Sequence, residues 1–452
     1  MAYSVSPLRS TAICYTPKAI CHMPDKVDVV VIGAGLAGLA AAYHLADAGI
    51  ETIVIERGDF PGSKNVTGGR LYLNPVRPFF PADFWNDAPF ERTVVKEKLS
   101  MLSPHASTTV EFFDEKFRDP PHSVTILRAK FDQWLADKVS EKGAFIISKN
   151  KVDDLIYEGT RVVGVKATDS ELLCDCVVVA DGVLSFIAEK AKISAARDPH
   201  HFALGIKEII ELPAKTIEDR FGVSAGEGVA QLFFGSITDA MLGGGFLYTN
   251  RESISLGMVV GIEALSHHEP RIEAPELMEI LKARPEIAPL IDGGNMVEYS
   301  AHVIPEGGIR ALPKLVGDGI VLAGDAAGLG LNMGITVRGM DFALASGALA
   351  ARAIKDAKTK NDSSATSLGV YEQSLRDCFV IKDLQTFAAM PNVLDNARMY
   401  TKYPEAIASI FQQMFWVGDQ PKDKLSATAI REAMKAFGNL DAVKDALGMM
   451  RV

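Results

Sequence analysis

The segment VDVVVIGAGLAGLAAAYHLADAGIETIVIE, residues 27–56, determines the fold that this sequence predicts. It reads as an apolar strand, a glycine turn, an alanine-rich helix and a second apolar strand that ends in an acid. Within it, G-x-G-x-x-G stands where the first strand becomes the helix, as in dinucleotide-binding domains. The segment therefore predicts an α/β fold with a Rossmann-type site for a dinucleotide.

Each residue of this turn has an expected role. Gly33 permits the sharp bend, Gly35 lets a pyrophosphate approach the backbone, and Gly38 lets the helix lie close to the sheet. The helix begins near Leu36 and Ala37, so its free N–H groups and the positive end of its dipole are directed at the phosphates.

Glu56 ends the second strand, at the position where a carboxylate binds the ribose hydroxyls of a dinucleotide. A close helix–strand crossing without a ligand is the alternative, but it gives no reason for an acid at the end of an apolar strand. The loop that follows, residues 57–72, can surround a ligand with backbone donors or form an ordinary surface turn. Its candidate cofactor contacts are Arg57, Lys64, Asn65, Gly68 and Gly69.

Two later strands also end beside an acid and a glycine. The apolar strand LLCDCVVVAD ends in Asp181 and Gly182, and the short strand GIVLA is followed by Gly324 and Asp325. Ligands of open α/β sheets bind at the carboxyl ends of the strands, so these four residues are further candidates. Arg128, at the start of the helix predicted in LRAKFDQWLADKVSEKG, can reach an anionic ligand.

Composition excludes several classes of protein. The 452 residues carry a net charge of −10 without a dense Lys/Arg block, so we expect no nucleic-acid partner. The five cysteines form no C-x-x-C pair, so we expect no disulfide framework, iron–sulfur cluster or other metal site. No run of 18 or more apolar residues occurs, so no segment is expected to span a bilayer. Residues 1–26 lack the apolar core of a signal peptide and are expected to form a disordered extension, or to precede a true start at Met23.

Long motifs along the chain resemble those of one family. They are KNVTGGRLY (64–72), ELPAKTIEDRF (211–221), GGGFLYTN (243–250), VEYSAHVIPEGG (297–308), LAGDAAGLGLNMGITVRGMDFA (322–343) and LDNARMY (394–400). From Val27 onward the chain resembles the FAD-dependent oxidoreductases of the glutathione-reductase-like class. Within that class it is most similar to the FixC family, the flavoprotein subunits of Fix-type electron-transfer-flavoprotein–quinone oxidoreductase systems.

The resemblance implies where FAD binds. The adenine half would lie on Gly33–Gly38, with Glu56 on the ribose and Arg128 near the pyrophosphate. Asp325 would bind the ribityl chain, and a long helix opening at Gly334–Ile335 would direct its positive end at the isoalloxazine ring. That contact would stabilise the reduced, anionic ring. No catalytic side chain is implied, because the flavin itself carries the electrons.

Membrane quinone is the implied electron acceptor. Its site would lie in GGGFLYTN, whose glycine N–H groups would bind a quinone carbonyl and whose larger side chains would wall the ring. The same segment is our candidate for contact with a membrane surface, with an ordinary glycine-rich strand as the alternative. The residues concerned are Gly243, Gly244, Gly245, Phe246, Leu247 and Tyr248.

The resemblance also implies partners and a location. The electron donor would be an electron-transfer flavoprotein with alpha and beta subunits (FixB- and FixA-like), and a FixX-like ferredoxin would supply the cluster that this chain lacks. In nitrogen-fixing systems the family is associated with splitting electrons between quinone and ferredoxin. We expect a cytoplasmic protein, peripheral on the inner face of the cell membrane. A geranylgeranyl-reductase-like lipid reductase and an FAD-holding assembly scaffold without turnover are the alternatives.

The expected fold is a glutathione-reductase-like FAD-binding Rossmann domain with an inserted, mainly antiparallel β-sheet domain for the quinone and a C-terminal helical region. The FAD-binding domain would comprise residues 27–75, 125–190 and 300–355. The quinone domain would comprise 76–124 and 191–299, and residues 356–452 would form the helical region, where a partner docks.

Overall fold

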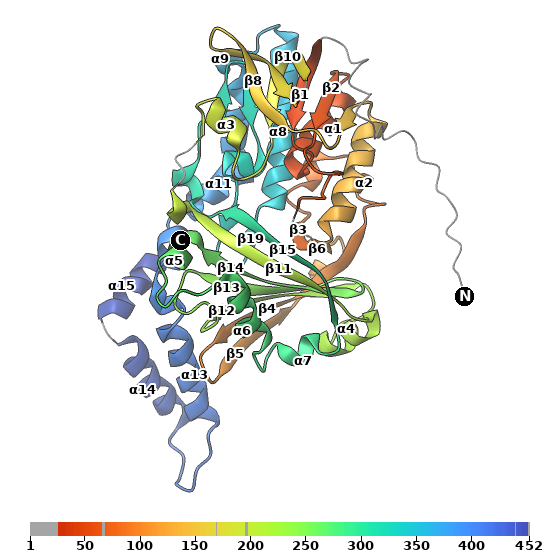
Figure 1. Cartoon of the computed structure of the whole chain (residues 1–452). Helices are drawn as coiled ribbons and strands as arrows, with labels where there is room; N and C mark the ends of the chain where they lie inside the picture. The colour runs from red at the N-terminus through yellow and green to blue at the C-terminus, as the bar shows by residue number, and fades with distance from the viewer. Residues whose placement is uncertain (1–25, 66–67, 169, 195–197, 439, 451–452) are drawn as a thin grey trace, which may run out of the picture.

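The computed structural model describes residues 26–450 apart from 66–67, 169, 195–197 and 439. Residues 1–25, predicted as a disordered extension, lie outside the described residues. Figure 1 shows two layered parts, one above the other, and a group of C-terminal helices along one side.

A mostly parallel sheet forms the first part. In spatial order its strands are β7 (Phe145–Ile147), β2 (Thr52–Ile55), β1 (Lys26–Ile32), β10 (Ser170–Val179), β17 (Ile320–Leu322) and β16 (Val316–Gly317), and the hairpin of β8 (Val152–Glu158) and β9 (Arg161–Ala167) joins it at β10. The five strands from β7 to β17 are parallel. Val30 and Val31 of the central β1 are fully buried, as expected of a strand with helices or strands on every side.

Helices cover this sheet (Figure 1). They are α1 (Leu36–Asp47), α2 (Arg128–Glu141), the short α3 (Phe186–Lys190) and the long α8 (Met340–Thr359). α1 and α8 pack closely because α8 has a glycine, Gly347, at the crossing. A Cβ on Gly347 would lie 2.1 Å from the carbonyl oxygen of Ala37.

The second part is built on a mainly antiparallel sheet, which confirms that prediction. In spatial order its strands are β15 (Asn295–Pro305), β11 (Phe202–Glu211), β14 (Ser253–Gly261), β13 (Gly243–Thr249), β12 (Glu227–Gly235), β4 (Phe90–Leu102), β6 (Ser123–Ile126) and β3 (Gly69–Tyr72), with β5 (Ser107–Phe113) paired to β4. Among these pairs only β12 and β4 run parallel. The helices of this part are α4 (Ala214–Phe221), α5 (Ile262–Ser266), α6 (Ala274–Lys282) and α7 (Ala288–Ile291).

Two strands belong to the second sheet, although residues of both were predicted to lie in the FAD-binding domain. β3 and β15 hydrogen-bond in the second sheet, although residues 69–75 and 300–305 were assigned to the FAD-binding domain. The remaining limits of the domains stay a prediction.

The long helix begins at Met340 and not at Gly334–Ile335, so that prediction was wrong. The residues before it form a tight hairpin of β18 (Leu331–Asn332) and β19 (Val337–Arg338). The Asn332 carboxamide oxygen accepts the Gly334 N–H at 2.9 Å, which competes with helix formation. Gly334 has φ +75°, in the left-handed region, so the helix cannot pass through it.

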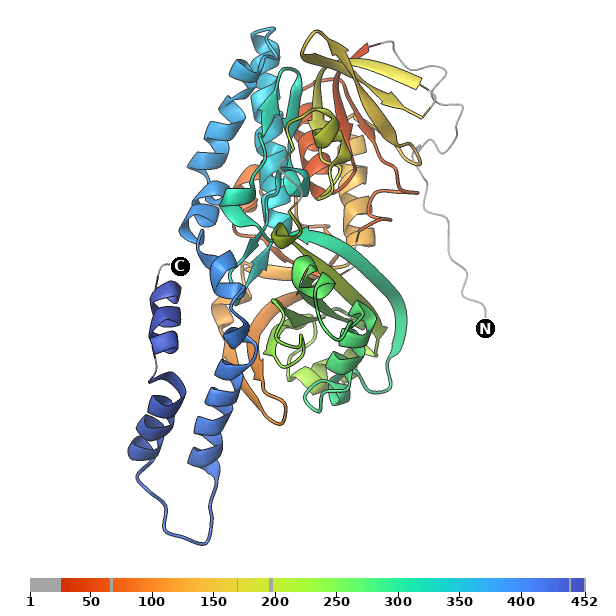
Figure 2. The ribbon, with the colours of Figure 1, turned by 60° about the vertical axis from the view of Figure 1, so that its left-hand side comes forward.

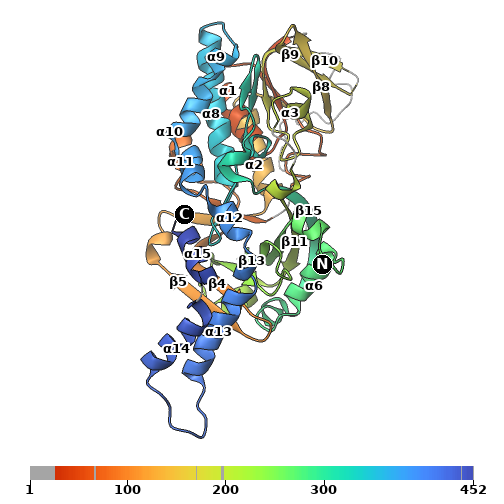
Figure 3. The same ribbon diagram turned by 90° about the vertical axis from the view of Figure 1, so that its left-hand side faces the viewer.

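Most of the described residues after 364 are helical. They form α9 (Ala365–Leu368), α10 (Val370–Asp377), α11 (Phe379–Thr386), α12 (Met390–Leu394), α13 (Lys402–Phe415), α14 (Leu425–Phe437) and α15 (Leu440–Met449). Figures 2 and 3 show α13 and α14 projecting as a helical hairpin beyond the second sheet, with α15 returning toward α12.

Candidate functional site

A cavity of about 1150 Å³ lies between the two sheets and is lined from both. It runs from the glycine turn after β1 to the glycines at the start of β13. Among the site residues predicted from the sequence, Gly38, Gly324 and Leu247 do not line it. Those that do are Gly33, Gly35, Leu36, Ala37, Glu56, Arg57, Lys64, Asn65, Gly68, Gly69, Arg128, Asp181, Gly182, Gly243, Gly244, Gly245, Phe246, Tyr248, Asp325, Gly334 and Ile335.

The glycine turn leaves room for a ligand at one position only. A Cβ on Gly33, which has φ +99°, would lie 2.4 Å from the Ala180 carbonyl oxygen, and one on Gly38 would lie 2.0 Å from the Gly33 carbonyl oxygen. A Cβ on Gly35 would meet no described atom within 4 Å. Gly33 and Gly38 therefore pack the turn, whereas Gly35 faces open cavity, as a backbone that a pyrophosphate approaches must.

Glu56 is buried beside this turn. Its Oε2 accepts the Ala34 N–H at 2.8 Å, and its Oε1 accepts the Gly58 N–H at 2.6 Å. Each carboxylate oxygen has a second lone pair, so the side chain can accept further hydrogen bonds from a ligand in the cavity.

Arg128 and Asn65 are held at the cavity wall by one buried acid. Arg128 forms two hydrogen bonds of 2.8 Å to the fully buried Asp132 carboxylate, which also accepts from the Asn65 amide at 2.6 Å. Sequence reasoning missed Asp132, which has the i+4 spacing from Arg128 expected for an ion pair on one helix face.

Two acids at strand ends face the cavity. Burial raises the pKa of Asp181, whose Oδ1 is buried without a hydrogen-bond partner in the described structure. Burial also raises the pKa of Asp325, while His302 and Arg128 act in the opposite direction. An unpartnered buried carboxylate oxygen is costly, so the Asp181 environment fits a ligand that donates to it.

Lys207, which the sequence did not single out, is buried on β11 and lines the same cavity. Its ammonium group donates to the Gly68 carbonyl oxygen and lies 6.0 Å from the centre of the Phe246 ring. Burial, with Arg128 as a smaller cause, lowers the pKa of Lys207 to about 7.

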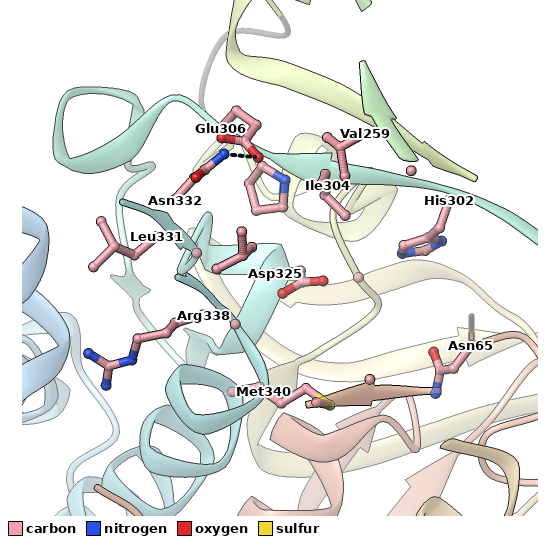
Figure 4. A pocket seen from close by; sticks show the side chains of 18 of the residues that line it. Asn65, Val259, His302, Ile304, Glu306, Asp325, Leu331, Asn332, Arg338 and Met340 are labelled. Atoms are coloured by element: carbon pink, nitrogen blue, oxygen red, sulfur yellow. Dashed lines mark hydrogen bonds between the residues drawn. The ribbon is translucent and has the colours of Figure 1, made fainter. Parts of the chain in front are cut away.

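Glu306 and Asn332 form a second group that sequence reasoning missed. Figure 4 shows both projecting into the cavity, where the Asn332 amide donates to Glu306 Oε1 at 3.5 Å. Neither residue belongs to a short motif with a known chemistry, so only the fold reveals that they meet.

β13 walls the cavity from inside the second sheet. It lies between β12 and β14, and its Leu247 is fully buried. The expectation that GGGFLYTN forms a membrane-contact surface was therefore wrong. Gly243, Gly244 and Gly245 do line the cavity, so their role toward a quinone stays a prediction.

Three segments of the chain match described families. Residues 28–75 match FAD dependent oxidoreductases, residues 202–304 match the ubiquinone-binding domain of ETF-QO, and residues 390–452 match the C-terminal domain of the ETF-QO/FixC family.

Whole proteins match over nearly their full length. A probable electron transfer flavoprotein-quinone oxidoreductase, YdiS of Escherichia coli K12, is 43% identical over 424 residues, which cover 94% of this chain and 98% of the relative. Protein FixC of Azotobacter vinelandii is 39% identical over 432 residues, with the same coverage.

Solved structures share the fold. A geranylgeranyl bacteriochlorophyll reductase-like protein from Thermoplasma acidophilum superposes with a TM-score of 0.72 at 20% identity, covering 94% of this chain and 99% of the other. The myxobacterial FAD-dependent halogenase CndH superposes with a TM-score of 0.64 at 18% identity, covering 95% and 98%.

The glycine turn with its open position at Gly35, the adjacent Glu56 and the unpartnered Asp181 fit an FAD dinucleotide. The solved structures show the fold, and sequence identity of 39–43% over nearly the whole length shows the family as well. The chain belongs to the ETF-QO/FixC family and is an FAD-dependent oxidoreductase.

Proposed function

We propose that this protein takes electrons from an electron-transfer flavoprotein and passes them through FAD to membrane quinone. The observation that carries the proposal is the continuous cavity of about 1150 Å³ from the glycine turn to β13. Sites for one small ligand usually measure about 300–1,000 Å³, so this cavity has room for a dinucleotide and part of a second ligand. The wall formed by β13 lies within residues 202–304, the segment that matches a ubiquinone-binding domain.

The chain's own residues would hold and orient the cofactor. Gly35 and the first turn of α1 would bind the pyrophosphate, Glu56 the ribose, and Asp181 a donor on the cofactor. The start of α8, at Gly339 and Met340, lines the cavity. It would therefore direct its positive end at the isoalloxazine ring, the role first expected of Gly334–Ile335. Bound FAD accepts electrons singly and releases them as a pair, which suits a junction between a one-electron carrier and a quinone.

The partners would be the two subunits of an electron-transfer flavoprotein, FixB- and FixA-like, and a FixX-like ferredoxin. The C-terminal helices are our docking region for the ferredoxin, and several of their large side chains are exposed. In a nitrogen-fixing cell, the set would divide electrons between quinone and ferredoxin.

Contact with the membrane would come from the tip of the α13–α14 hairpin. In the part of the chain that the structure describes, no helix has the length and hydropathy needed to cross a bilayer. At the tip, Phe415, Trp416 and Val417 are 79%, 69% and 80% exposed, and Lys422 and Lys424 follow in the connecting loop. Aromatic side chains beside lysines are typical of surfaces that insert shallowly into anionic membranes. We therefore propose that the protein is peripheral on the cell membrane, on its inner face.

The test is reconstitution with its partners. Reduced electron-transfer flavoprotein, the purified chain and the ferredoxin are combined with vesicles that contain ubiquinone, and quinol is measured. We expect quinol formation that requires the chain and its FAD. Reduction of a geranylgeranyl lipid without quinol would instead favour the lipid reductase, and a chain that binds FAD but transfers no electrons would favour the scaffold.

A further inference from the structure

The β13 end of the cavity is walled by apolar side chains of the C-terminal helices. The first of these helices, α12, contacts the β18–β19 hairpin: an atom built at the Gly334 Cβ position would lie 3.6 Å from both Met390 and Leu394. The apolar lining contributed by this region consists of Met390, Val393, Leu394, Met399 and, from α15, Met449.

Polar groups converge within this apolar end. The Tyr400 hydroxyl donates to the Leu394 carbonyl oxygen at 2.6 Å, and the Gly243 backbone N–H hydrogen-bonds to the same hydroxyl and acts to lower its pKa. Glu306 acts on the pKa of Tyr400 in the opposite direction, and its carboxyl accepts from Asn332 of the β18–β19 hairpin, which α12 contacts. Tyr400 thus joins the C-terminal region to Gly243, one of the glycines predicted to bind a quinone, and Glu306 lines the same cavity through its contact with the neighbouring hairpin.

The Glu306 carboxyl is surrounded by protein but faces the cavity (Figure 4). Among the described residues, its side chain accepts a hydrogen bond from the Asn332 amide, whose oxygen in turn accepts the Gly334 N–H. The five acids that line the cavity in the described residues are Glu56, Asp153, Asp181, Glu306 and Asp325. Glu306 is the member of this set that lies at the β13 end.

Burial raises the pKa of Glu306 to about 7, and the Asn332 amide lowers it slightly. Tyr400 is a titratable side chain of the same cavity whose pKa Glu306 raises, and Figure 4 shows His302 and Asp325 farther along the cavity. A carboxyl that titrates near neutral pH can both give and take a proton during turnover.

We propose that Glu306 is the acid that protonates a quinone carbonyl oxygen bound between β13 and Tyr400. The inference rests on the proposed function, since it needs a quinone in this cavity. Conversion of a quinone to a quinol takes two electrons and two protons. The Glu306 O–H bond breaks as one quinol O–H bond forms, and the carboxylate regains a proton from solvent. Reduced FAD, when bound, would supply both electrons and the second proton.

The experiment compares two acceptors for the reduced holoprotein. Dithionite-reduced protein is mixed anaerobically with a short-chain soluble ubiquinone, or with ferricyanide, which accepts electrons without protons. We expect Glu306→Gln to slow reoxidation by quinone about 100-fold or more and to leave reoxidation by ferricyanide unchanged. The inflection near pH 7 in the quinone rate is expected to disappear in this variant.

Two variants control for structure. Glu306→Asp retains a carboxyl and is expected to keep quinone reduction within about tenfold of wild type. Glu252→Gln makes the same charge change on an exposed residue outside the cavity and is expected to behave as wild type. FAD content and quinone affinity, measured by fluorescence quenching, are expected to be equal in all four proteins.

Three results would overturn the inference: an unchanged quinone rate in Glu306→Gln, an equal loss with both acceptors, or an equal loss in the Gln and Asp variants. If Glu306→Gln fails to retain FAD, Glu306→Asp carries the test, because a pH-independent quinone rate in that variant also contradicts the inference. Failure of the proposed function looks different: wild-type protein would then be reoxidised by ferricyanide and by no quinone.

Discussion

At the scale of single residues, a substitution at Gly35 is expected to weaken FAD binding while the protein still folds. Gly35→Ala is expected to fold normally, because the added Cβ meets no protein atom and the residue has φ −83°. The methyl group would instead occupy space that the pyrophosphate needs. We expect FAD affinity to fall at least about tenfold, or about 1.4 kcal/mol, while the apoprotein loses at most about 1 kcal/mol at this N-cap and still folds.

Isothermal titration with FAD and urea denaturation of the apoprotein check this prediction. Gly33→Ala is the contrasting variant, since its Cβ would overlap the Ala180 carbonyl and its φ is positive. It is expected to destabilise the apoprotein itself. Equal FAD affinity of Gly35→Ala and wild type would contradict this assignment of the pyrophosphate site.

Lys207 is expected to make the stability of the apoprotein depend on pH. Its pKa is about 7 in the folded protein and about 10.4 when unfolded, so the unfolded chain binds more protons between these values. Below pH 7, the folded protein bears the full cost of burying the charged Lys207 ammonium. Above pH 7, the free energy of unfolding of the apoprotein rises by up to about 1.4 kcal/mol per pH unit.

Urea denaturation of the apoprotein between pH 7 and 10 measures this slope, with Lys207→Met as the reference that removes the titrating group. The free energy of unfolding of Lys207→Met should exceed that of wild type by an amount that shrinks as pH rises. A constant difference would show that Lys207 keeps an ordinary pKa.

The sequence predicted the residues that belong to motifs and missed those that act alone. Gly33, Gly35 and Glu56 sit in one continuous β–α–β unit, so local patterns were sufficient to find them. Lys207 lies on β11 and Glu306 directly follows β15, and neither has a spacing that marks it. Only the pairing of those strands brings them to the cavity.

At the scale of elements, the crossing of α1 and α8 depends on Gly347. Gly347→Ala places a Cβ 2.1 Å from the Ala37 carbonyl oxygen and must push the helices apart. We expect a loss of about 1–3 kcal/mol in the free energy of unfolding, as for other overpacked cores.

The matched control is Gly448→Ala in α15, where an added Cβ meets nothing within 4 Å. Removing a glycine from an unobstructed helix is expected to stabilise it by up to about 1 kcal/mol. Thermal unfolding of both variants tests the pair, and a neutral Gly347→Ala would contradict the close helix packing.

The first residue of α8 could not be predicted correctly from the sequence pattern. Gly334 to Arg338 continue the apolar pattern of the helix, so the sequence favoured a helix from Gly334. The Asn332 side chain and the positive φ of Gly334 select a hairpin instead. Arg338, the last residue of the hairpin, forms an ion pair with Asp341 in the first turn of α8, with Nε to Oδ2 at 2.8 Å.

At the scale of the whole molecule, the projecting α13–α14 hairpin is expected to bind membranes. Replacing Phe415, Trp416 and Val417 with serine removes the exposed apolar tip without touching the cavity. We expect binding to vesicles that contain phosphatidylglycerol to fall at least about tenfold, and reoxidation by a soluble quinone to stay unchanged.

Vesicle sedimentation measures the binding, and Phe145→Ser is the control, because Phe145 is 70% exposed on β7, the edge strand of the parallel sheet. Unchanged vesicle binding of the triple variant would remove the tip as the membrane contact and favour its use by a protein partner.

The division into two sheets was predictable from the sequence, whereas their joint cavity was not. The β–α–β unit and the alternating strands of residues 200–300 indicated a parallel and an antiparallel sheet. That β3 and β15 join the second sheet, and that α12 and α15 contribute to the cavity wall, depends on contacts between residues far apart in the chain.

The central claim is that one cavity holds FAD and quinone close enough for direct electron transfer. The most direct measurement is anaerobic titration of the dithionite-reduced holoprotein with a soluble ubiquinone, followed by the visible absorbance of the flavin. We predict that oxidised flavin returns in proportion to added quinone, with one quinol formed for each FAD. Flavin that stays reduced in excess quinone, although ferricyanide oxidises it at once, would contradict the account.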